Sequence, residues 1–356
     1  MKIERIETKL LEMPYRKPLV TATNRFEVAR GLLVKLTTAA GIEGYGYADL
    51  FPRTGETPET ARHVIEKILG PKLAARELEE LPRLRAEIDH SLTANPRAKA
   101  ALESALYDAL AKSRGVPLYL LLGGLYRNEI KVVKMVSVDD PEAMAEEAKR
   151  LAAGGLALKL KMSGKIGSDL KRVAAVRSAV GDGVFIKVDA NESYDAKTAL
   201  RCARGLAELG VEIFEQPVPR DQLSALAEVK KLSPIKIEAD QSVRTFADAY
   251  QLVSNRMVDA INTGVQKAGG LHEVRKIAEL CALNGIRCAL SNTAGSMIRD
   301  APAVQLAAST PGIAPLAELG EFEAVSGDPF AGLAVNHGSI RVPEGDGLGV
   351  YPRELR

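Results

Sequence analysis

The chain has 356 residues, a formal net charge of +2 and a composition that is 46% hydrophobic and 26% charged. This near-neutral balance argues against a nucleic-acid-binding surface, and no apolar run has the length of a membrane span or the pattern of a secretory signal. The three cysteines, Cys202, Cys281 and Cys288, form no CxxC pair. We therefore expect buried thiols in the cytoplasm, and neither a disulfide nor a zinc framework.

The first 125 residues show strand patterns followed by helix patterns. Residues 2–11 and 31–38 are predicted strands, and a turn at Gly41 joins the second of them to residues 42–47 in a predicted hairpin. Thr57-Pro58 and Asn95-Pro96 are typical helix starts. The helix after Asn95 has a wide apolar face, which predicts that it is buried.

From about residue 130, short β-rich runs alternate with helical stretches. This alternation is typical of parallel βαβ units, and seven or eight such units in about 200 residues fit a (β/α) barrel. A further strand is predicted at 338–342, in a tail from about residue 327 that we expect to pack on the front part. The predicted barrel strands are residues 130–136, 156–161, 184–189, 211–215, 235–239, 258–262, 286–290 and 316–319.

A charged residue ends or follows each of five successive predicted strands. These residues are Lys161, Asp189, Glu215, Asp240 and Lys267, at spacings of 28, 26, 25 and 27 residues. One βα unit separates each from the next, so a barrel places all five on the rim formed by the carboxyl ends of its strands. Active sites of such barrels lie on that rim.

The residue types on this rim suit metal-assisted proton abstraction. Three acidic residues on adjacent strands offer an all-oxygen site for Mg²⁺ or Mn²⁺, which would relieve the repulsion among the carboxylates. Lys159 and Lys161 share a face of one strand, so we expect each charge to lower the pKa of the other lysine and favour a general base. With Lys267 on the other side, the pattern predicts removal of a proton next to a carboxylate through a metal-stabilised enediolate.

These residues resemble the enolase superfamily and, within it, the muconate-lactonizing-enzyme subgroup, which also holds dipeptide epimerases, N-succinylamino-acid racemases and o-succinylbenzoate synthases. The resemblance covers nearly the whole chain. The motifs that carry it are KLK at 159–161, DAN at 189–191, EQP at 215–217, DQS at 240–242 and KAGG at 267–270.

The resemblance implies an α/β fold, a modified (β/α)7β TIM-type barrel over residues 126–326. An α+β capping domain would be formed by residues 1–125 and completed by the tail 327–356. It also implies a set of site residues: Mg²⁺ on Asp189, Glu215 and Asp240, acid/base roles for Lys161 and Lys267, and a polar supporting role beside them for Lys159 and Asn191.

Three features depart from the pattern of the subgroup. Gln241 follows the fifth-strand Asp, where the subgroup usually has Glu, and it is either an inert spacer or a hydrogen-bonding member of the site. Tyr47 stands where many members carry Glu. Arg299-Asp300 replaces an expected Glu-Thr/Ser pair in a segment, 296–300, that resembles the seventh-strand region of epimerases.

Candidate substrate-binding residues lie in loops and near the eighth strand. Glu321 and Glu323 fall roughly where dipeptide epimerases carry a DxD motif that binds the ammonium group of the dipeptide, so they predict an amine-bearing substrate. The resemblance places front-part loops over the barrel mouth, where Arg53 is the best candidate for contact with a substrate anion. The other candidates are Arg25, Phe51, Ser296 and Met297.

We therefore expect a cytoplasmic, Mg²⁺-dependent isomerase that forms a homo-oligomer and binds a small carboxylate. A racemase or epimerase of dipeptides or N-acyl amino acids fits best, because bases are available on both faces of the substrate. The alternative enzyme is a cycloisomerase or syn-eliminating lyase, similar to muconate cycloisomerase or o-succinylbenzoate synthase. A catalytically silent barrel that only binds a carboxylate stays open because of Gln241 and Tyr47, although the paired lysines argue against pure binding. A structural or partner-binding protein is a third alternative.

Overall fold

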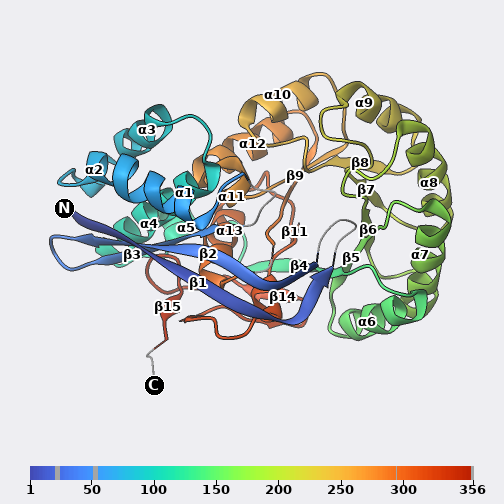
Figure 1. Cartoon of the computed structure of the whole chain (residues 1–356), viewed down its shortest axis with the longest axis horizontal. Coiled ribbons are helices and arrows are strands. Elements are labelled where there is room, and N and C mark those ends of the chain that lie inside the picture. The colour runs from blue at the N-terminus through green and yellow to red at the C-terminus, as the bar shows by residue number, and fades with distance from the viewer. Residues whose placement is uncertain (21–24, 51–54, 294, 354–356) are drawn as a thin grey trace.

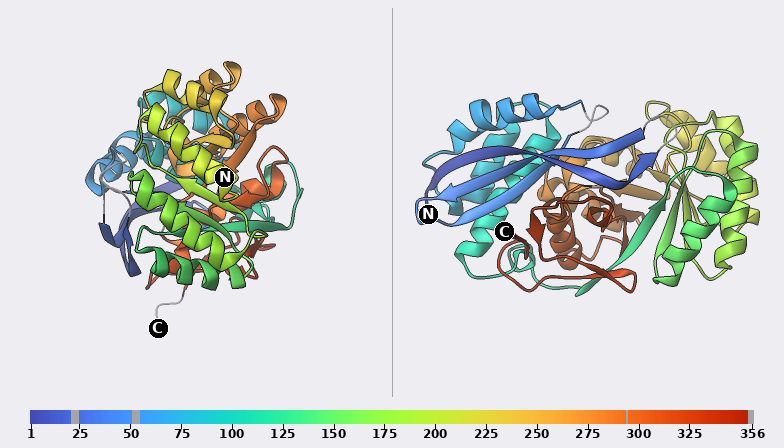
Figure 2. Two further views of the ribbon diagram at one scale, coloured as in Figure 1. Left: turned by 90° about the vertical axis from the view of Figure 1, so that its right-hand side faces the viewer. Right: turned by 60° about the horizontal axis from the view of Figure 1, so that its bottom comes forward.

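The computed structural model of the chain describes residues 1–20, 25–50, 55–293 and 295–353. In Figure 1 the N-terminal strands and helices (blue) lie to one side of a barrel whose elements run from green to orange. The C-terminal tail (red) lies beside both parts in the right-hand view of Figure 2.

The N-terminal part begins with an antiparallel sheet. Its strands, in the order β1-β2-β3, are β1 (Ile3–Val20), β2 (Arg25–Thr38) and β3 (Glu43–Asp49). A tight hairpin joins β2 to β3, and its Gly41 has a φ of +80°, a conformation that glycine adopts readily. The predicted hairpin is confirmed, and the first two strands are longer than predicted.

Helix α4 (Pro96–Ser113) packs directly on β3. It begins after Asn95, as predicted, and nearly all of its residues from 98 to 111 are buried. A Cβ atom at Gly46 would lie 1.9 Å from the carbonyl oxygen of Ala101, so only glycine permits this approach of helix to strand. The helix and the sheet therefore form two layers in direct contact.

The other helices of this part are short. The predicted start at Thr57 is confirmed, because Thr57 and Thr60 form a reciprocal capping box at the start of α1 (Pro58–His63). The remaining elements are η2 (Val64–Leu69), α2 (Gly70–Leu73), η3 (Leu78–Glu80), α3 (Leu81–Ser91) and α5 (Leu118–Leu121).

In the described part of the chain, eight parallel strands form the barrel, and all eight predicted strands are confirmed. β4 to β10 pair in chain order, β11 pairs with β4, and a bridge from Ser291 to Glu318 closes the circle after β10. The strands are β4 (Glu129–Val136), β5 (Ala157–Lys161), β6 (Ile186–Asp189), β7 (Ile213–Glu215), β8 (Lys236–Ala239), β9 (Ala260–Thr263), β10 (Arg287–Leu290) and β11 (Leu316–Ala317).

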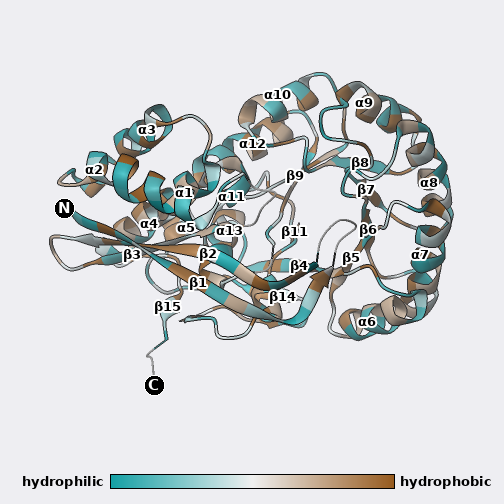
Figure 3. Ribbon diagram, in the orientation of Figure 1, coloured by the Kyte–Doolittle hydropathy of each residue, from teal (hydrophilic) through white to brown (hydrophobic). Residues whose placement is uncertain are grey.

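Helices surround the barrel (Figure 1) and carry both hydrophilic and hydrophobic segments (Figure 3). This pattern is expected of helices that cover a sheet with one face and meet water with the other. The helices are α6 (Pro141–Ala153), α7 (Ile166–Val180), α8 (Ala196–Glu208), α9 (Leu223–Leu232), α10 (Phe246–Ser254), α11 (Val265–Ala268), α12 (Leu271–Leu283) and α13 (Met297–Ser309).

The tail contacts both parts of the molecule. The predicted strand is confirmed as β14 (Ser339–Arg341), but it pairs antiparallel with β4 of the barrel. Farther along, Gly347 accepts a hydrogen bond from the N–H of Leu118 at 2.8 Å and so packs on the front part, as predicted. The division at residues 125 and 326 stays a prediction. The other tail elements are β12 (Phe330–Ala331), β13 (Val335–Asn336) and β15 (Tyr351–Pro352), and η4 (Glu321–Ala324) lies just before the tail.

No helix in the described ranges combines the length and the apolar character that crossing a membrane requires.

Candidate active site

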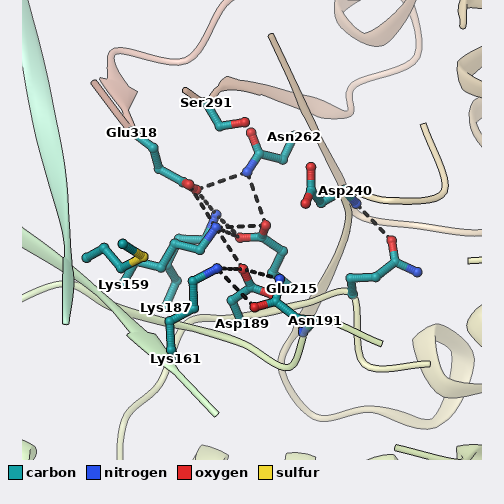
Figure 4. A network of polar contacts seen from close by, with 12 residues as sticks. Lys159, Lys161, Lys187, Asp189, Asn191, Glu215, Asp240, Asn262, Ser291 and Glu318 are labelled. Carbon is teal, nitrogen blue, oxygen red and sulfur yellow. Dashed lines mark hydrogen bonds and ion pairs between the residues drawn. The ribbon is translucent and has the colours of Figure 1, made fainter. Parts of the chain in front are cut away.

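The five predicted rim residues lie at one end of the barrel. Lys161, Asp189 and Glu215 end β5, β6 and β7 and stand in register, since Lys161 pairs with Asp189 and Asp189 with Glu215. Asp240 follows β8, and Lys267 lies on α11 directly after β9. The three acidic residues therefore lie between the two lysines in strand order. Figure 4 shows Lys161, and also Lys159 and Lys187, pointing toward the carboxylates.

Lys161 is held by two side chains of the third-strand motif. Its Nζ donates to Asp189 Oδ2 at 2.6 Å and to Asn191 Oδ1 at 3.0 Å. Asn191 in turn donates its backbone N–H to Asp189 Oδ1 at 2.8 Å, and its φ of +46° gives the sharp turn that brings the side chain back to the strand end. Lys161 is thus oriented by residues of the barrel.

Lys267 is held on the other side of the acidic residues. Its Nζ donates to Asp240 Oδ1, and also to the carbonyl oxygens of Asp240 at 3.0 Å and of Asn262 at 2.8 Å. Each of the two rim lysines is therefore paired with an outer carboxylate, Lys161 with Asp189 and Lys267 with Asp240.

Beneath the rim lies a second layer of buried charges. Lys159 donates to Glu215 Oε1 at 2.9 Å and to Glu318 Oε2 at 2.8 Å, and it lies 3.0 Å from Asp189 Oδ2. Lys187 lies 2.6 Å from Glu318 Oε1 and 2.7 Å from Glu215 Oε2, and it also pairs with Glu238. Two ammonium groups are therefore shared among buried carboxylates, as charges require inside a protein.

The carboxylates change the expected behaviour of Lys159. Burial lowers the pKa of Lys159, but Asp189, Glu215 and Glu318 outweigh burial and raise this pKa well above its ordinary value. The predicted lowering of the Lys159 pKa is therefore wrong, because the carboxylates outnumber the neighbouring lysine charge. These carboxylates therefore favour the cationic form of Lys159.

The pKa values of the acidic groups shift in opposite directions. Burial raises the pKa of Asp189, but Lys159 and Lys161 outweigh burial and hold it far below its usual range. Burial and then the Asp189 charge raise the pKa of Glu215 to about 8, despite Lys159 and Lys187. The same two lysines overcome burial at Glu318 and lower its pKa to about 2. Glu215 is thus the carboxylate most in need of further positive charge.

The donor set fits a hard divalent cation. Glu238 Oε1 is buried and has no hydrogen-bond partner among the described residues, whereas Glu215 Oε2 lies 2.7 Å from Lys187 Nζ. Among the described residues, one carboxylate oxygen from each of Glu215, Glu238 and Glu318 lies within 4.8 Å of the other two. Lys187 already contacts all three, so this lower cluster has its counter-ion. The predicted set on Asp189, Glu215 and Asp240 shares Glu215 with it and stays a proposal.

Four polar residues of the barrel interior were missed by the sequence reasoning: Lys187, Glu238, Asn262 and Glu318. Asn262 donates to Glu318 Oε1 at 3.0 Å and to Glu215 Oε1 at 3.3 Å. The spacing of about one βα unit continues past Lys267, through Ser291 to Glu318, so it contained the signal for Glu318. Lys187 and Glu238 lie two residues before Asp189 and Asp240 and therefore face the same side of their strands.

The glutamine of the fourth-strand motif fixes the loop after β8. Gln216 Oε1 accepts the N–H groups of Asp240 at 3.0 Å and Ser242 at 3.1 Å, and Gln216 Nε2 donates to Ser242 Oγ at 2.9 Å. Gln241 lies in this loop, and its Oε1 is buried without a hydrogen-bond partner in the described ranges. Such an atom is free to accept from a ligand, which favours the hydrogen-bonding interpretation of Gln241.

The predicted substrate-binding residues are spread over several places. Phe51 and Arg53 lie outside the described residues. Arg25 is exposed and lies 3.4 Å from Glu27. Ser296 and the backbone of Met297 are buried, where both donate to the carboxylate of Asp328 in the tail. These contacts give Ser296 and Met297 a structural task at the start of α13.

The two glutamates after β11 point toward β4. Glu321 Oε1 accepts from the N–H of Met135 at 3.4 Å, and Glu323 Oε2 lies 3.2 Å from Lys134 Nζ. Glu318, three residues before Glu321, is the acidic residue of this segment that reaches the lysines of the site (Figure 4). The substrate role of Glu321 and Glu323 stays a prediction, and Glu318 is added as a candidate.

Of the departures from the expected motifs, Arg299-Asp300 has structural partners at the junction of the two parts, whereas the hydroxyl group of Tyr47 has none among the described residues. Arg299 pairs with Asp49 of β3 at 2.9 Å, and Asp300 Oδ2 accepts from the N–H of Gly320 at 2.7 Å. Tyr47, at 1% exposure, has a hydroxyl group without a hydrogen-bond partner in the part of the chain that the structure describes. Arg299-Asp300 thus joins α13 to the sheet and to the segment after β11.

Acidic residues between two lysines, at the carboxyl ends of the strands of a capped barrel, form a group of side chains suited to proton transfer. The sequence models of known families match both parts: "mandelate racemase / muconate lactonizing enzyme, N-terminal domain" over residues 5–123 and "enolase C-terminal domain-like" over residues 143–356. The chain belongs to this family, the muconate-lactonizing-enzyme subgroup of the enolase superfamily.

Relatives of this chain are isomerases. It is 34% identical to an L-Ala-D/L-Glu epimerase of Bacillus subtilis, over 100% of this chain and 98% of the relative. It is also 34% identical to muconate cycloisomerase 1 of Rhodococcus opacus, over 98% and 96% of the two chains. The chain is accordingly an isomerase of the superfamily, in the group of racemases, epimerases and cycloisomerases.

Solved structures agree with this assignment. A substrate-liganded L-Ala-D/L-Glu epimerase of B. subtilis superposes with a TM-score of 0.96 at 33% identity, over 100% of both chains. A dipeptide epimerase of Enterococcus faecalis V583, complexed with Mg and L-Leu-L-Tyr, superposes with a TM-score of 0.94 at 31% identity, over 98% of this chain and 99% of the other. The predicted barrel with a capping part is confirmed.

Proposed function

We propose that this chain is a Mg²⁺-dependent epimerase that moves the α-proton of a dipeptide or N-acyl amino acid between the two faces of its α-carbon. The observation that carries the proposal is the pairing of Lys161 with Asp189 and of Lys267 with Asp240, on either side of Glu215. Two bases separated by an anion-stabilising centre are what a 1,1-proton transfer needs.

The residues Asp189, Glu215 and Asp240 would hold the metal ion, which would stabilise the negative charge that develops on the substrate carboxylate. Lys161 would remove or return a proton on one face, and Lys267 would do so on the other. Lys159, held cationic by its carboxylate partners, would add positive charge next to the same centre. Its raised pKa suits this electrostatic role better than proton transfer.

The substrate class is supported by the relatives and by the chemistry of the site. Relatives over most of the chain include dipeptide epimerases and an N-succinyl-L-Arg/Lys racemase of Bacillus cereus, 30% identical over 85% of this chain. Gln241 Oε1, which has no hydrogen-bond partner among the described residues, is able to accept from an amine or amide N–H of such a substrate.

The test is exchange of the α-proton with solvent in D₂O, followed by mass spectrometry over a library of dipeptides and N-acyl amino acids. We expect Mg²⁺-dependent deuterium incorporation with no change in the constitution of the substrate. Lys236→Ala is the matched control. Lys236 is exposed at the start of β8, the end of that strand away from the rim, so its loss should leave exchange unchanged.

A cycloisomerase is the second candidate, because muconate cycloisomerase 1 matches this chain as closely as the epimerase does. In that case one lysine would carry out the acid/base step and the other would only stabilise charge. A product of changed constitution, with no exchange across the amino-acid library, would reject the epimerase and favour this candidate.

A further inference from the structure

The turn that carries Lys267 is held from outside the barrel. α11 follows β9, and Gln266, the residue before Lys267, donates its Nε2 to the carbonyl oxygen of Tyr47 at 2.6 Å. Gln266 and Tyr47 are both buried. Because Tyr47 lies on β3, this bond ties the Lys267 turn to the sheet of the N-terminal part.

A second contact holds the other end of the same turn. Glu103 of α4 is buried, and its Oε2 accepts the N–H of Leu271, the first residue of α12, at 2.5 Å. Its Oε1 lies 3.1 Å from Nε of Arg85. The residue at the cap position of α12 is Gly270, which has no side chain, so Glu103 supplies the acceptor that a helix start needs.

The fit between Glu103 and this turn is tight. A Cβ atom at Gly270 would lie 1.8 Å from Glu103 Oε2, and Gly270 has a φ of +150°. The carboxylate therefore rests against the backbone three residues after Lys267. Glu103 and Gln266 together fix both ends of the short segment that presents the Lys267 side chain to the site.

Lys161 is supported differently. Its hydrogen-bond partners, Asp189 and Asn191, belong to the barrel, and Lys161 itself ends a barrel strand paired with β6. The two rim lysines thus depend on different parts of the molecule, one on the barrel alone and one on the barrel together with the N-terminal part.

We propose that Glu103, acting with Gln266, is a positioning residue for Lys267, so that proton transfer on the Lys267 face of the substrate depends on the N-terminal part while transfer on the Lys161 face does not. The inference rests on the proposed epimerase function. A displacement of about 1 Å of a reacting group costs on the order of 10²-fold in rate, so loss of this support is measurable without loss of the fold.

The experiment measures α-proton exchange in D₂O separately for each epimer of an active substrate, in the full-length protein with Mg²⁺. Lys161→Ala and Lys267→Ala first show which epimer loses its exchange with each lysine. Glu103→Gln is then expected to slow exchange of the Lys267-dependent epimer by about tenfold or more and to leave the other epimer within about twofold of wild type.

Asp108→Asn is the matched control. Asp108 lies on the same helix, is buried like Glu103, and also accepts backbone N–H groups, from Tyr45 and Leu348 at 2.8 Å each. Neither of these partners belongs to α11, which carries Lys267, or to α12, which follows it. A general loosening of α4 would slow both epimers equally in both variants, whereas the proposal requires the loss to be one-sided and confined to Glu103→Gln.

Equal slowing of both epimers by Glu103→Gln, or no slowing, would overturn the inference and leave the epimerase intact. If the wild type exchanges no substrate, the proposed function fails, and positioning is then read from amide hydrogen–deuterium exchange of residues 265–272. Faster exchange there in Glu103→Gln than in Asp108→Asn supports the positioning role, and equal exchange in the two variants rejects it.

Discussion

The two charged layers of the barrel differ in how far they are open to a ligand. At the rim, the side chains of Lys161 and Lys267 are 10% and 20% exposed. In the layer beneath, Lys187 is 4% and Glu238 0% exposed, and both are enclosed by other charges. Residues of similar type therefore have different tasks: Lys161 and Lys267 can meet a substrate, while Lys187 and Glu238 balance charge beneath them.

Removal of the metal ion should have the largest effect on activity. The carboxylates of Asp189, Glu215 and Asp240 would lose the cation proposed to bind them, and the developing negative charge on the substrate would lose its main partner. We expect EDTA to lower epimerisation by more than about 10³-fold and added Mg²⁺ to restore it. Undiminished turnover after EDTA treatment and dialysis would contradict a metal-dependent site.

Substitution of either rim lysine should cause the second largest loss of activity. Because general acid–base catalysis contributes about 10²- to 10⁴-fold, Lys161→Ala and Lys267→Ala should each lower the epimerisation rate by about 10³-fold. Polarimetry measures this loss, and the exposed Lys236→Ala serves as the control. Residual activity within tenfold of wild type in either variant would remove that lysine from the mechanism.

Substitutions in the lower charged layer should lower the free energy of unfolding. Lys187→Met leaves Glu238 and Glu318 without their shared cation, and removal of one partner of a buried ion pair costs about 3 to 5 kcal/mol. Urea unfolding measures this change. The double variant Lys187→Met/Glu238→Gln should lose less than the sum of the single variants, since it removes a charge that the first change left uncompensated. Additive losses would show that the two residues do not interact.

A smaller effect is expected from the pH dependence of stability. Burial raises the pKa of Glu103 from its ordinary 4.5 to about 7, although Arg85 opposes the shift. The folded protein therefore binds this proton more tightly than the unfolded chain does. Stability from this group is complete below pH 4.5 and is lost as the pH rises through about 7.

Glu103→Gln removes this titration. Compared with that variant, the wild type should lose unfolding free energy between about pH 5 and about pH 7.5, as measured by urea unfolding at several pH values. Parallel pH profiles for the two proteins would show that Glu103 has the same pKa in the folded and unfolded states.

The sequence predicted the barrel because strand and helix patterns alternate, and it predicted the rim because a charged residue ends or follows each of five successive strands at a regular spacing. Lys161, Asp189 and Glu215 stand at strand ends, where alternation and spacing together determine position. The same reasoning missed Glu318, because β11 is only two residues long and ends before it. It considered only the residues at strand ends, and so it missed Lys187, which lies two residues before Asp189 on the same face of β6.

Other features required the folded structure. Glu103 and Leu271 are 168 residues apart, and no local pattern connects them. The pKa of Lys159 was predicted in the wrong direction, because the sequence places Lys161 beside it but does not show how closely Asp189, Glu215 and Glu318 surround it. Contacts between distant segments and the net charge around a buried group depend on tertiary packing.

The central claim is that Lys161 and Lys267 serve opposite faces of one α-carbon. The most direct measurement is epimer-resolved α-proton exchange in D₂O for Lys161→Ala and Lys267→Ala with Mg²⁺. The account predicts complementary losses: each variant stops exchanging one epimer and continues to exchange the other. Loss of exchange for the same epimer in both variants, or for both epimers in only one variant, would contradict a two-base site.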